Sequence, residues 1–427
     1  MSRLDAPYKL ALAFLAFILL GYVFYPLAMM VSGSLHVNGA FSIERYLELL
    51  DLKNSANLEA VTNSVAVSVL SVALGGVIGV LLAFTFTQVH FPFTRLLSRL
   101  VILPVALPPL VGVIAFLFVF GESGFLPRLV QRIFILDEVP FFLDGVSAIV
   151  AIHVYSFNVY FYLLVSNALQ QLDGSLLEAA SSLGSSRWNT FRRVVLPVLR
   201  PAFVGASALT FMASMASFSA PLIFAGDRRF LTTQIYVTKL NGDLEAAAAQ
   251  SMLLALISIG FFVLLSLSRR SLKPKTKGAP RTTVMNLSPI VRRLLIGTAI
   301  VVLGLELLPI VSIILISFVK EGSWTWQVFP SAYTVENYAR LLLDSRVFEP
   351  IRNSLLMSAL TVVAAVVVGV TAAFVVVKGE LGRSRLAVDT ILNVSFAIPG
   401  TVIAIGLIYT FNKPMLTSGF TVLVGGL

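Results

Sequence analysis

Long apolar stretches are the feature that most constrains what this chain can fold into. A helix needs about 20 mostly apolar residues to cross the hydrocarbon core of a membrane, and nine stretches meet that requirement. They are residues 8–32, 62–87, 96–120, 145–168, 201–225, 247–268, 294–318, 354–377 and 387–411. Hydrophobic residues make up 57% of the chain and charged residues only 12%, about half the charged share of a globular domain. The sequence therefore predicts an all-α polytopic membrane protein.

The distribution of Lys and Arg predicts the orientation of these spans. Segments facing the cytoplasm are enriched in basic residues. If the N-terminus is cytoplasmic, the inner segments collect most of the basic residues, whereas most acidic residues fall in the outer segments. The basic linker, residues 269–293, contains eight Lys or Arg residues and no Asp or Glu. We expect this linker to bind anionic lipid head groups, which explains the net charge of +10 without a nucleic-acid partner.

Cysteine is absent from the sequence. Disulfides, thiolate metal sites and cysteine nucleophiles are therefore excluded. The three histidines do not form a metal site either, because His36 and His90 are predicted on opposite sides of the membrane and His153 lies alone in a span. We expect no metal bound by the chain itself.

The two segments on either side of the linker resemble each other. A shift of 290 residues aligns Asn63-Ser64 with Asn353-Ser354, Gly79 with Gly369, and Pro109 with Pro399. The segment that begins at Ser42 resembles the one that begins at Thr334, two residues out of phase. Because both halves enter the membrane from the same side, the repeat is parallel, and its pseudo-twofold axis along the membrane normal is a natural place for a translocation path.

The repeat divides the chain into three parts. Residues 1–268 form a first transmembrane domain, 269–293 the linker, and 294–427 a second transmembrane domain. By comparison with the first half, the second stops before two or three further spans and a large cytoplasmic loop. We expect a fragment, a frameshifted product or part of a longer sequence, with completion by another polypeptide as an alternative. A competing hypothesis is that truncation leaves a non-transporting remnant or an assembly subunit.

The loop between the fourth and fifth stretches is the most specific motif. The sequence predicts a short helix from residue 176, a break at Gly184, and a second helix that starts near residue 188 and is closed by Pro197. Asp173 or Ser175 caps the first helix, and Gly184 allows a turn that a Cβ would hinder. The motif consists of Glu178, Ala179, Ala180, Gly184, Leu196 and Pro197.

This spacing resembles the EAA loop of type I ABC importer permeases, the inner-membrane components of binding-protein-dependent transport. The basic linker between fused halves, together with the segment Phe218–Phe224, resembles the iron(III) importers of that family. The resemblance implies a bacterial inner-membrane permease whose loop is a coupling helix, with Glu178 contacting an ATP-binding subunit and Gly184 keeping the bend.

The resemblance also implies the partners. No P-loop pattern occurs in the sequence, so we expect two copies of a separate ATP-binding subunit to carry ATP and Mg²⁺, while this chain binds no cofactor. A solute-binding protein would deliver the cargo. Iron(III) is the first expectation, with thiamine, phosphonate or polyamine as alternatives.

The translocation path is less well defined by the sequence. We expect small and hydroxyl-bearing residues to line it, with helix-packing roles as the alternative for each. The candidates are Tyr155, Asn158, Ser214, Ser217, Ser219 and Pro399. Glu306, deep in the seventh stretch, is expected to pair with a neighbouring helix. An ion-coupled secondary transporter, a competing class, would need a relay of such groups.

Overall fold

The computed structural model describes residues 6–37, 40–51, 55–267, 287–324, 327–378 and 398–411 of the chain. Within these residues eight helices are long and apolar enough to cross a membrane, which confirms the predicted all-α membrane fold. Of the ninth predicted stretch, residues 387–397 lie outside the described residues, and the rest forms the shorter apolar helix α20. Most of the basic linker, residues 269–286, also lies outside them.

The first half contains most of the elements. In chain order they are α1 (Ala6–Leu19), the π-helix η1 (Leu20–Phe24), α2 (Tyr25–Ser34), β1 (His36–Val37), β2 (Ala40–Phe41), α3 (Glu44–Leu50), α4 (Ser55–Gln88), α5 (Thr94–Leu100), α6 (Leu103–Ala106), α7 (Pro109–Phe120), α8 (Phe125–Ile133), α9 (Gly145–Gln170), α10 (Gly174–Ser182), α11 (Arg187–Thr190), the π-helix η2 (Phe191–Val195), α12 (Leu196–Met215), α13 (Ser219–Phe224), α14 (Leu231–Leu240) and α15 (Leu244–Leu267).

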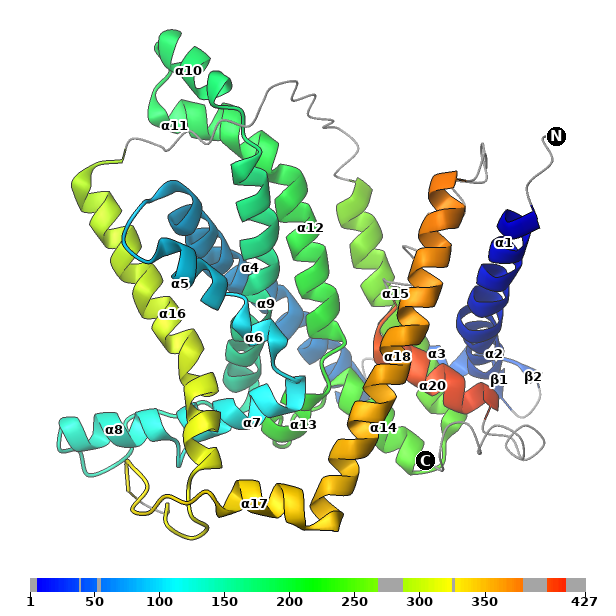
Figure 1. Ribbon diagram of the computed structural model, residues 1–427. Helices are drawn as coiled ribbons and strands as arrows, with labels where there is room; N and C mark the ends of the chain where they lie inside the picture. Colours follow the sequence, from blue (N-terminus) through cyan, green and yellow to red (C-terminus); the bar gives the residue numbers. More distant parts are fainter. Residues whose placement is uncertain are drawn as a thin grey trace.

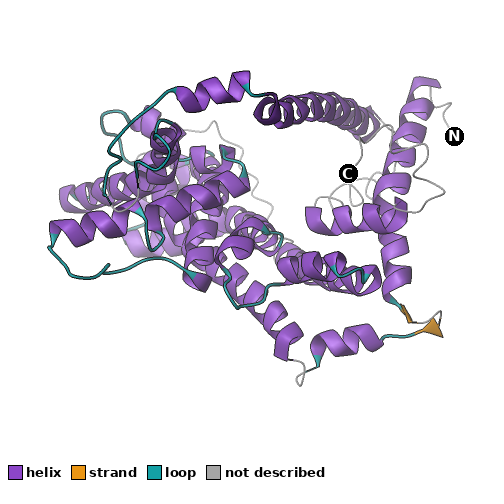
Figure 2. Cartoon of the chain, turned by 90° about the horizontal axis from the view of Figure 1, so that it is seen from below, coloured by secondary structure: helices purple, strands orange, loops and turns teal. Residues whose placement is uncertain are grey.

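The second half is described in fewer elements. They are α16 (Pro289–Ser317), α17 (Glu336–Leu343), α18 (Ser345–Lys378) and α20 (Gly400–Phe411). The first five residues of α16 belong to the predicted linker, because Ser288 caps the helix by accepting from the Val291 amide and so starts it earlier than the apolar pattern indicates. The described strands are confined to a small hairpin at the edge of the molecule, in which His36 pairs with Phe41 (Figure 2).

The third predicted span, 96–120, is not one helix. Residues 94–120 instead pass along the molecule as α5, α6 and α7 (Figure 1). The breaks fall at Val101–Ile102, just before α6 begins with Leu103 and Pro104, and at Leu107–Pro108, just before α7 begins with Pro109. Proline cannot donate a helical hydrogen bond, and at the second break it also disfavours the helical conformation of the preceding residue, so that Leu107 is extended. The prolines therefore replace a simple membrane helix by three short ones.

The fifth predicted span, 201–225, is also shifted. Helix α12 begins at Leu196 and ends at Met215, and residues 216–218 separate it from α13. Pro201 lies inside α12 rather than at its start, so the sequence pattern placed the beginning of this span too late and its end too far along the chain.

Close packing of α4, α9 and α12 forms the core of the first half (Figure 1). Gly79 on α4 meets the backbone of α9, since a Cβ at this position would lie 2.3 Å from the carbonyl oxygen of Asn158 and 2.6 Å from Cβ of Phe161. Small residues allow membrane helices to approach closely in this way. The same core takes in Ala299 and Leu303 of α16, a helix from the second half.

The structure reproduces the internal repeat. Helices α4 and α18 each have 34 residues, and their first and last residues differ by the same 290 positions that align the sequence. Helices α7 and α20 each have 12 residues and begin beside the matched prolines Pro109 and Pro399. The hydroxyl of Ser34 lies 2.7 Å from that of Tyr46, and in the second half Ser317 lies 2.6 Å from Tyr338 in the same manner.

The first helix of each half packs against the other half. Helix α16 contacts α4 and α7, whereas α1 contacts α18 and α2 contacts α20. The packing of α2 on α20 is tight, because a Cβ at Gly406 would lie 2.7 Å from Sδ of Met30. The first helix of each repeat therefore packs on the other repeat. We call this arrangement the exchange of first helices, and it joins the two halves.

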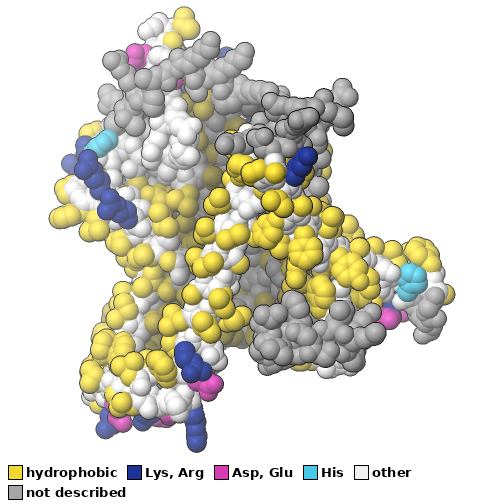
Figure 3. Space-filling view, turned by 45° about the vertical axis from the view of Figure 1, so that its right-hand side comes forward, with side chains coloured by type: hydrophobic (Ala, Val, Ile, Leu, Met, Phe, Trp, Pro, Cys, Tyr) yellow, Lys and Arg dark blue, Asp and Glu magenta, His cyan; other side chains and the backbone are white. Residues whose placement is uncertain are grey.

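Hydrophobic side chains cover the exposed faces of the spans. Figure 3 shows one such face, with apolar side chains over its middle and most charged ones toward its ends. On α18, Leu355, Val363 and Val370 are each about 60% exposed or more, which suits a surface in contact with hydrocarbon or with another apolar helix.

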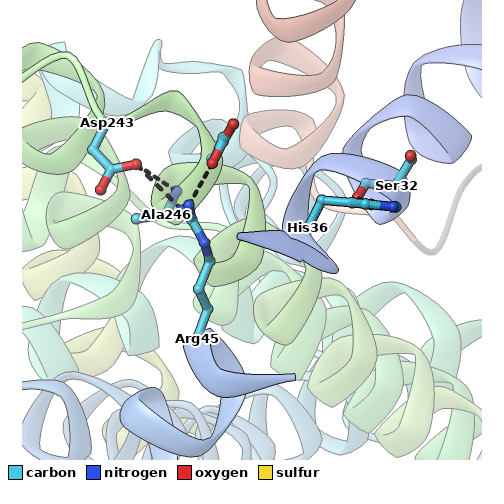
Figure 4. A network of polar contacts seen from close by, with 6 residues as sticks. Ser32, His36, Arg45, Asp243 and Ala246 are labelled. Atoms are coloured by element: carbon cyan, nitrogen blue, oxygen red, sulfur yellow. Dashed lines mark hydrogen bonds and ion pairs between the residues drawn. The ribbon is translucent and has the colours of Figure 1, made fainter. Parts of the chain in front are cut away.

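A polar network ties α3 to the start of α15 at the end of the molecule away from α10. Arg45 forms ion pairs with Asp243 and Glu245, and Asp243 also accepts from the backbone amide of Ala246, 2.8 Å away (Figure 4). The Arg45 side chain is only 17% exposed, so this network fastens the loop before α4 to the last span of the first half.

Candidate functional site

The loop that carries the sequence motif projects from one end of the helical bundle. Helices α10 and α11 lie beyond the ends of α9 and α12, which lead into and out of the loop (Figure 1). Asp173 caps α10 by accepting a hydrogen bond from the Ser175 amide at 2.9 Å. This bond lowers the pKa of the Asp173 carboxyl, because it stabilises the charged form. Of the two predicted caps, the structure uses Asp173.

Gly184 makes the turn between α10 and α11. Its φ is +74°, a left-handed conformation that glycine adopts without steric cost. The Gly184 amide donates to the carbonyl of Ser181, and the Ser185 amide donates to that of Ala180. This pair of bonds is the Schellman arrangement that ends many helices, so the bend predicted at Gly184 is confirmed.

The outer surface of the loop is exposed and partly apolar. Glu178 and Ala179 are exposed and Ala180 is half-buried, while Leu183 is 87% and Trp188 66% exposed. Large apolar side chains so accessible beyond the ends of the spans are typical of a protein contact surface. The motif residues Glu178, Ala179 and Ala180 thus lie on a face that another protein could contact.

Pro197 does not close the second helix of the loop, as the sequence predicted. The chain runs from α11 through the π-helix η2 directly into α12, and Leu196 and Pro197 form the first turn of α12. Proline lacks an amide donor, and the wider π-turn before it lets the helical path continue despite the missing bond. The loop is therefore joined to α12 by continuous helix, an arrangement suited to transmitting a movement.

A cavity of about 390 Å³ lies among α6, α7, α9 and α13. Its polar lining consists of His153, Ser156, Tyr160, Ser217 and Ser219. A second cavity of about 260 Å³ adjoins it, because Tyr160, Ala213 and Ala216 line both.

The matched prolines of the two repeats line different cavities of this pair. Pro109 lines the first cavity and Pro399 the second. The first cavity is lined by residues of the first half alone, whereas the second lies between α9 and α12 of the first half and Pro399 of the second. The second cavity is therefore the one that lies between the two halves, where a pseudo-twofold axis is expected.

The structure brings together only part of the predicted path. Ser217, Ser219 and Pro399 line the cavities, whereas Tyr155 and Asn158 lie on another face of α9 and Ser214 lies behind the wall. His153, Ser156 and Tyr160 were not among the predicted path residues. Their spacing of three and four residues would have placed them on one face of the helix.

His153 is held from behind the cavity wall. It is buried, and its Nδ1 lies 2.8 Å from Oγ of Ser214 and 3.4 Å from Oγ of Ser71. Ser214 therefore supports a lining residue instead of lining the cavity itself. No group of three or more His, Cys, Asp or Glu able to hold a metal occurs among the described residues.

Glu306 pairs with a neighbouring helix, as expected. Its Oε1 accepts a hydrogen bond from Nδ2 of Asn158 at 2.8 Å, and both side chains are buried. Because Glu306 lies on α16 and Asn158 on α9, the bond joins the second half to the helix that lines the cavity. The same Asn158 nitrogen also lies near the carbonyls of Val154 and Tyr155, which orients the amide toward Glu306.

Comparison with known proteins gives the family. The sequence profile of "Binding-protein-dependent transport system inner membrane component" matches residues 75–278. A probable molybdenum ABC transporter permease of Haloferax volcanii is 31% identical over 214 residues, which cover 50% of this chain and 76% of the relative. The chain therefore belongs to the family of binding-protein-dependent transport inner-membrane components. Within that family it is a permease of the type I ABC importers.

Two relatives match almost the whole chain. A probable ABC transporter permease of Sinorhizobium fredii is 27% identical over 99% of this chain and 75% of its own length. A putative ferric transport system permease of Haemophilus influenzae is 24% identical over 94% of this chain. The chain spans 64% of the length of that ferric permease.

A solved structure agrees with the fold. The bacterial ABC transporter for the acidic polysaccharide alginate superposes on 62% of this chain and 96% of its own, with a TM-score of 0.51 and 16% identity. At this identity the similarity concerns the fold alone.

Proposed function

We propose that this chain is the permease of an ATP-driven importer and that solute passes between its two repeats. The observation that carries the proposal is the second cavity, which lies between the first half and Pro399 of the second half and adjoins the cavity that Pro109 lines. Hydroxyl groups of Ser156, Ser217 and Ser219 line this space and are suited to contacts that form and break as a solute moves.

Movement would be driven from the loop of α10 and α11. A separate ATP-binding subunit, present in two copies and carrying ATP and Mg²⁺, would seat against Glu178 and the exposed side chains of Leu183 and Trp188. Because η2 joins this loop to α12 without a break, closure of the ATPase would shift α12 and alter the cavity wall. Transport is then a population shift, driven by the different affinity of the ATPase for two states of the permease.

Iron(III) is the proposed cargo. The ferric permease relative matches 94% of this chain, whereas the molybdenum permease relative matches only 50%. Molybdate, thiamine, phosphonate and polyamines are the alternatives. A solute-binding protein would select the cargo and deliver it to the end of the molecule opposite α10, with the N-terminus on the cytoplasmic side of the bacterial inner membrane.

Reconstitution tests this function. The full chain, its ATPase and candidate binding proteins would be placed in liposomes, and ATPase activity and iron(III) uptake would be measured with each binding protein loaded and empty. We expect the loaded iron(III)-binding protein to stimulate both. Stimulation by another loaded binding protein would reassign the cargo, and uptake driven by an ion gradient without any ATPase would favour a secondary transporter.

A further inference from the structure

Helix α8 does not cross the membrane although its sequence is part of an apolar segment. Residues 109–133 are apolar enough to be taken for a single span, but residues 121–124 break it after α7. Figure 1 shows α8 extending sideways from the bundle, across the direction of α9 and α12, at the end opposite α10 and α11. Its position is that of a helix lying along a membrane surface.

The two sides of α8 differ in polarity. Apolar residues recur at helical spacing on one side, and the polar residues Arg128, Gln131 and Arg132 lie on the other. These three line a cavity of about 710 Å³ together with Glu122 and Asp137, and Ile135 and Leu136 of the following turn also line it. The polar side of α8 therefore faces a space that contains charged groups, which leaves the apolar side of the helix, with Ile133 at its end, turned away from it. The apolar residues of α8 are Phe125, Leu126, Leu129, Val130 and Ile133.

The turn after α8 carries the most exposed apolar side chains of this region. Ile133 is 63%, Phe134 68% and Ile135 90% exposed. Ile135 also has a φ of +51°, a conformation that is strained for a β-branched residue. Strain of this kind persists where the surroundings or a function require it, and here it turns a large apolar side chain outward.

We propose that residues 125–136, which we call the α8 elbow, anchor this end of the permease in the interfacial layer of the membrane. The occupant of its apolar surface is lipid, with the tips of Ile133 and Phe134 among the upper acyl carbons and Arg132 at head-group phosphates. Amphipathic helices with basic polar faces lie in this layer. The leaflet is the outer one if α10 and α11 face the cytoplasm, and only that detail rests on the proposed function.

Continuity with the lipid-facing surface favours lipid over a protein partner. The elbow follows α7, whose Leu117 and Phe118 are each about 40% exposed, and Phe141 and Phe142 continue the apolar surface toward the start of α9, also about 40% exposed. The anchor would hold α7, whose first residue Pro109 lines the cavity, at a fixed depth while the cytoplasmic end moves.

Spin labels test this placement, because the natural chain contains no cysteine. Ile133→Cys and Phe134→Cys would be labelled separately in the full chain in liposomes of phosphatidylethanolamine and phosphatidylglycerol. Collisions with oxygen, which concentrates in lipid, and with a water-soluble nickel complex would then be compared. We expect oxygen to prevail at both positions.

The matched control is Leu183→Cys, since Leu183 on the α10–α11 loop is 87% exposed and of similar size. Nickel should prevail there, so the oxygen-to-nickel ratio at residue 133 should exceed that at residue 183 several-fold. Equal ratios at the two sites would overturn the proposal. So would protection of residue 133 from both reagents only when a solute-binding protein is added, because the occupant would then be protein.

A second measurement tests the depth of the α8 elbow in the membrane without a spin label. In Phe134→Trp, the added fluorescence should be quenched more by lipids brominated near the head group than by lipids brominated near the end of the acyl chain. The reverse order would place the elbow in the hydrocarbon core and reject an interfacial anchor. Absence of quenching by either lipid would place it in water and reject the anchor altogether.

Discussion

Gly184 shows how a single backbone conformation sets the shape of a contact surface. Apart from its two chain neighbours, nothing among the described residues lies within 4 Å of a Cβ built there, so a side chain would have room. Any penalty of substitution must therefore come from the φ of +74°, which costs an ordinary residue about 1–2 kcal/mol. A β-branched residue, with its restricted side chain, is the least suited to this conformation.

Gly184→Val should therefore disturb coupling without preventing membrane insertion. We expect uptake and the stimulation of ATPase activity by loaded binding protein to fall together in the reconstituted complex. Gly184→Asn is the control, because asparagine tolerates the left-handed conformation, and it should retain most of both activities. Normal stimulation in the Val variant would show that this turn has no part in coupling.

Glu306 and Asn158 form a buried bond whose loss can be measured. Asn158→Leu removes the donor and leaves the Glu306 carboxyl without its partner on α9. We expect the free energy of unfolding in detergent to fall by about 1–2 kcal/mol, the range of interhelical hydrogen bonds in membrane proteins. Glu306→Gln should be nearly neutral, since its amide oxygen still accepts from Asn158.

The double variant Asn158→Leu with Glu306→Leu separates the bond from simple packing. It removes both partners of this hydrogen bond, so it should be more stable than Asn158→Leu alone. Thermal unfolding of the natural chain, of Asn158→Leu, of Glu306→Leu and of the double variant supplies the comparison. If the effects of the two substitutions simply add, the two side chains do not interact in the folded chain.

Among the elements, helix α10 depends on a charged cap. The hydrogen bond from the Ser175 amide lowers the pKa of Asp173, so the cap contributes stability above the ordinary carboxyl pKa. That contribution is lost as the pH falls through the lowered pKa. The protection of residues 174–183 from hydrogen exchange, measured relative to an unfolded chain at the same pH, should therefore be higher at neutral pH than in acid.

Asp173→Asn provides the control for this pH dependence. Asparagine caps helices well but does not titrate in this range. The variant should keep the protection of α10 at neutral pH and lose the acid-induced decrease in protection that is specific to this helix. An equal acid response in both proteins would assign the effect to some other group.

At the same scale, the sequence predicted the long helices better than the interrupted ones. The 290-residue register reappears in α4 and α18 because apolar, glycine and serine positions were matched over many turns. Hydropathy alone could not locate the breaks within residues 94–120 or the π-turn before Pro197. These features depend on which backbone carbonyls lose their helical hydrogen bond because proline has no amide hydrogen. Nor could it orient α9, on which His153 and Tyr160 face the cavity while Asn158 faces α16.

For the molecule as a whole, the exchange of first helices makes each repeat incomplete without the other. Met30 of α2 and Gly406 of α20 meet across this exchange, since a Cβ at residue 406 would lie 2.7 Å from Sδ of Met30. The pairing could not be predicted from the repeat, because a shift between halves says which segments correspond and not which ones touch. Only the contacts between helices in the structure show which segments pair.

A disulfide tests the exchange in the naturally cysteine-free chain. Met30→Cys with Gly406→Cys, carrying a protease site inserted between residues 269 and 286, should remain one species after oxidation and cleavage and separate on reduction. The control pair, Met30→Cys with Gly369→Cys, should separate without reduction, because nothing lies within 4 Å of a Cβ at residue 369. Two cleaved fragments from the oxidised test pair would contradict the exchange, and a linkage formed only between two copies of the chain would show that α2 reaches a neighbouring molecule instead. Retention of the link would establish that the second repeat's α20 is held by the first helix of the chain, so that any rocking of the repeats must carry these exchanged helices with it.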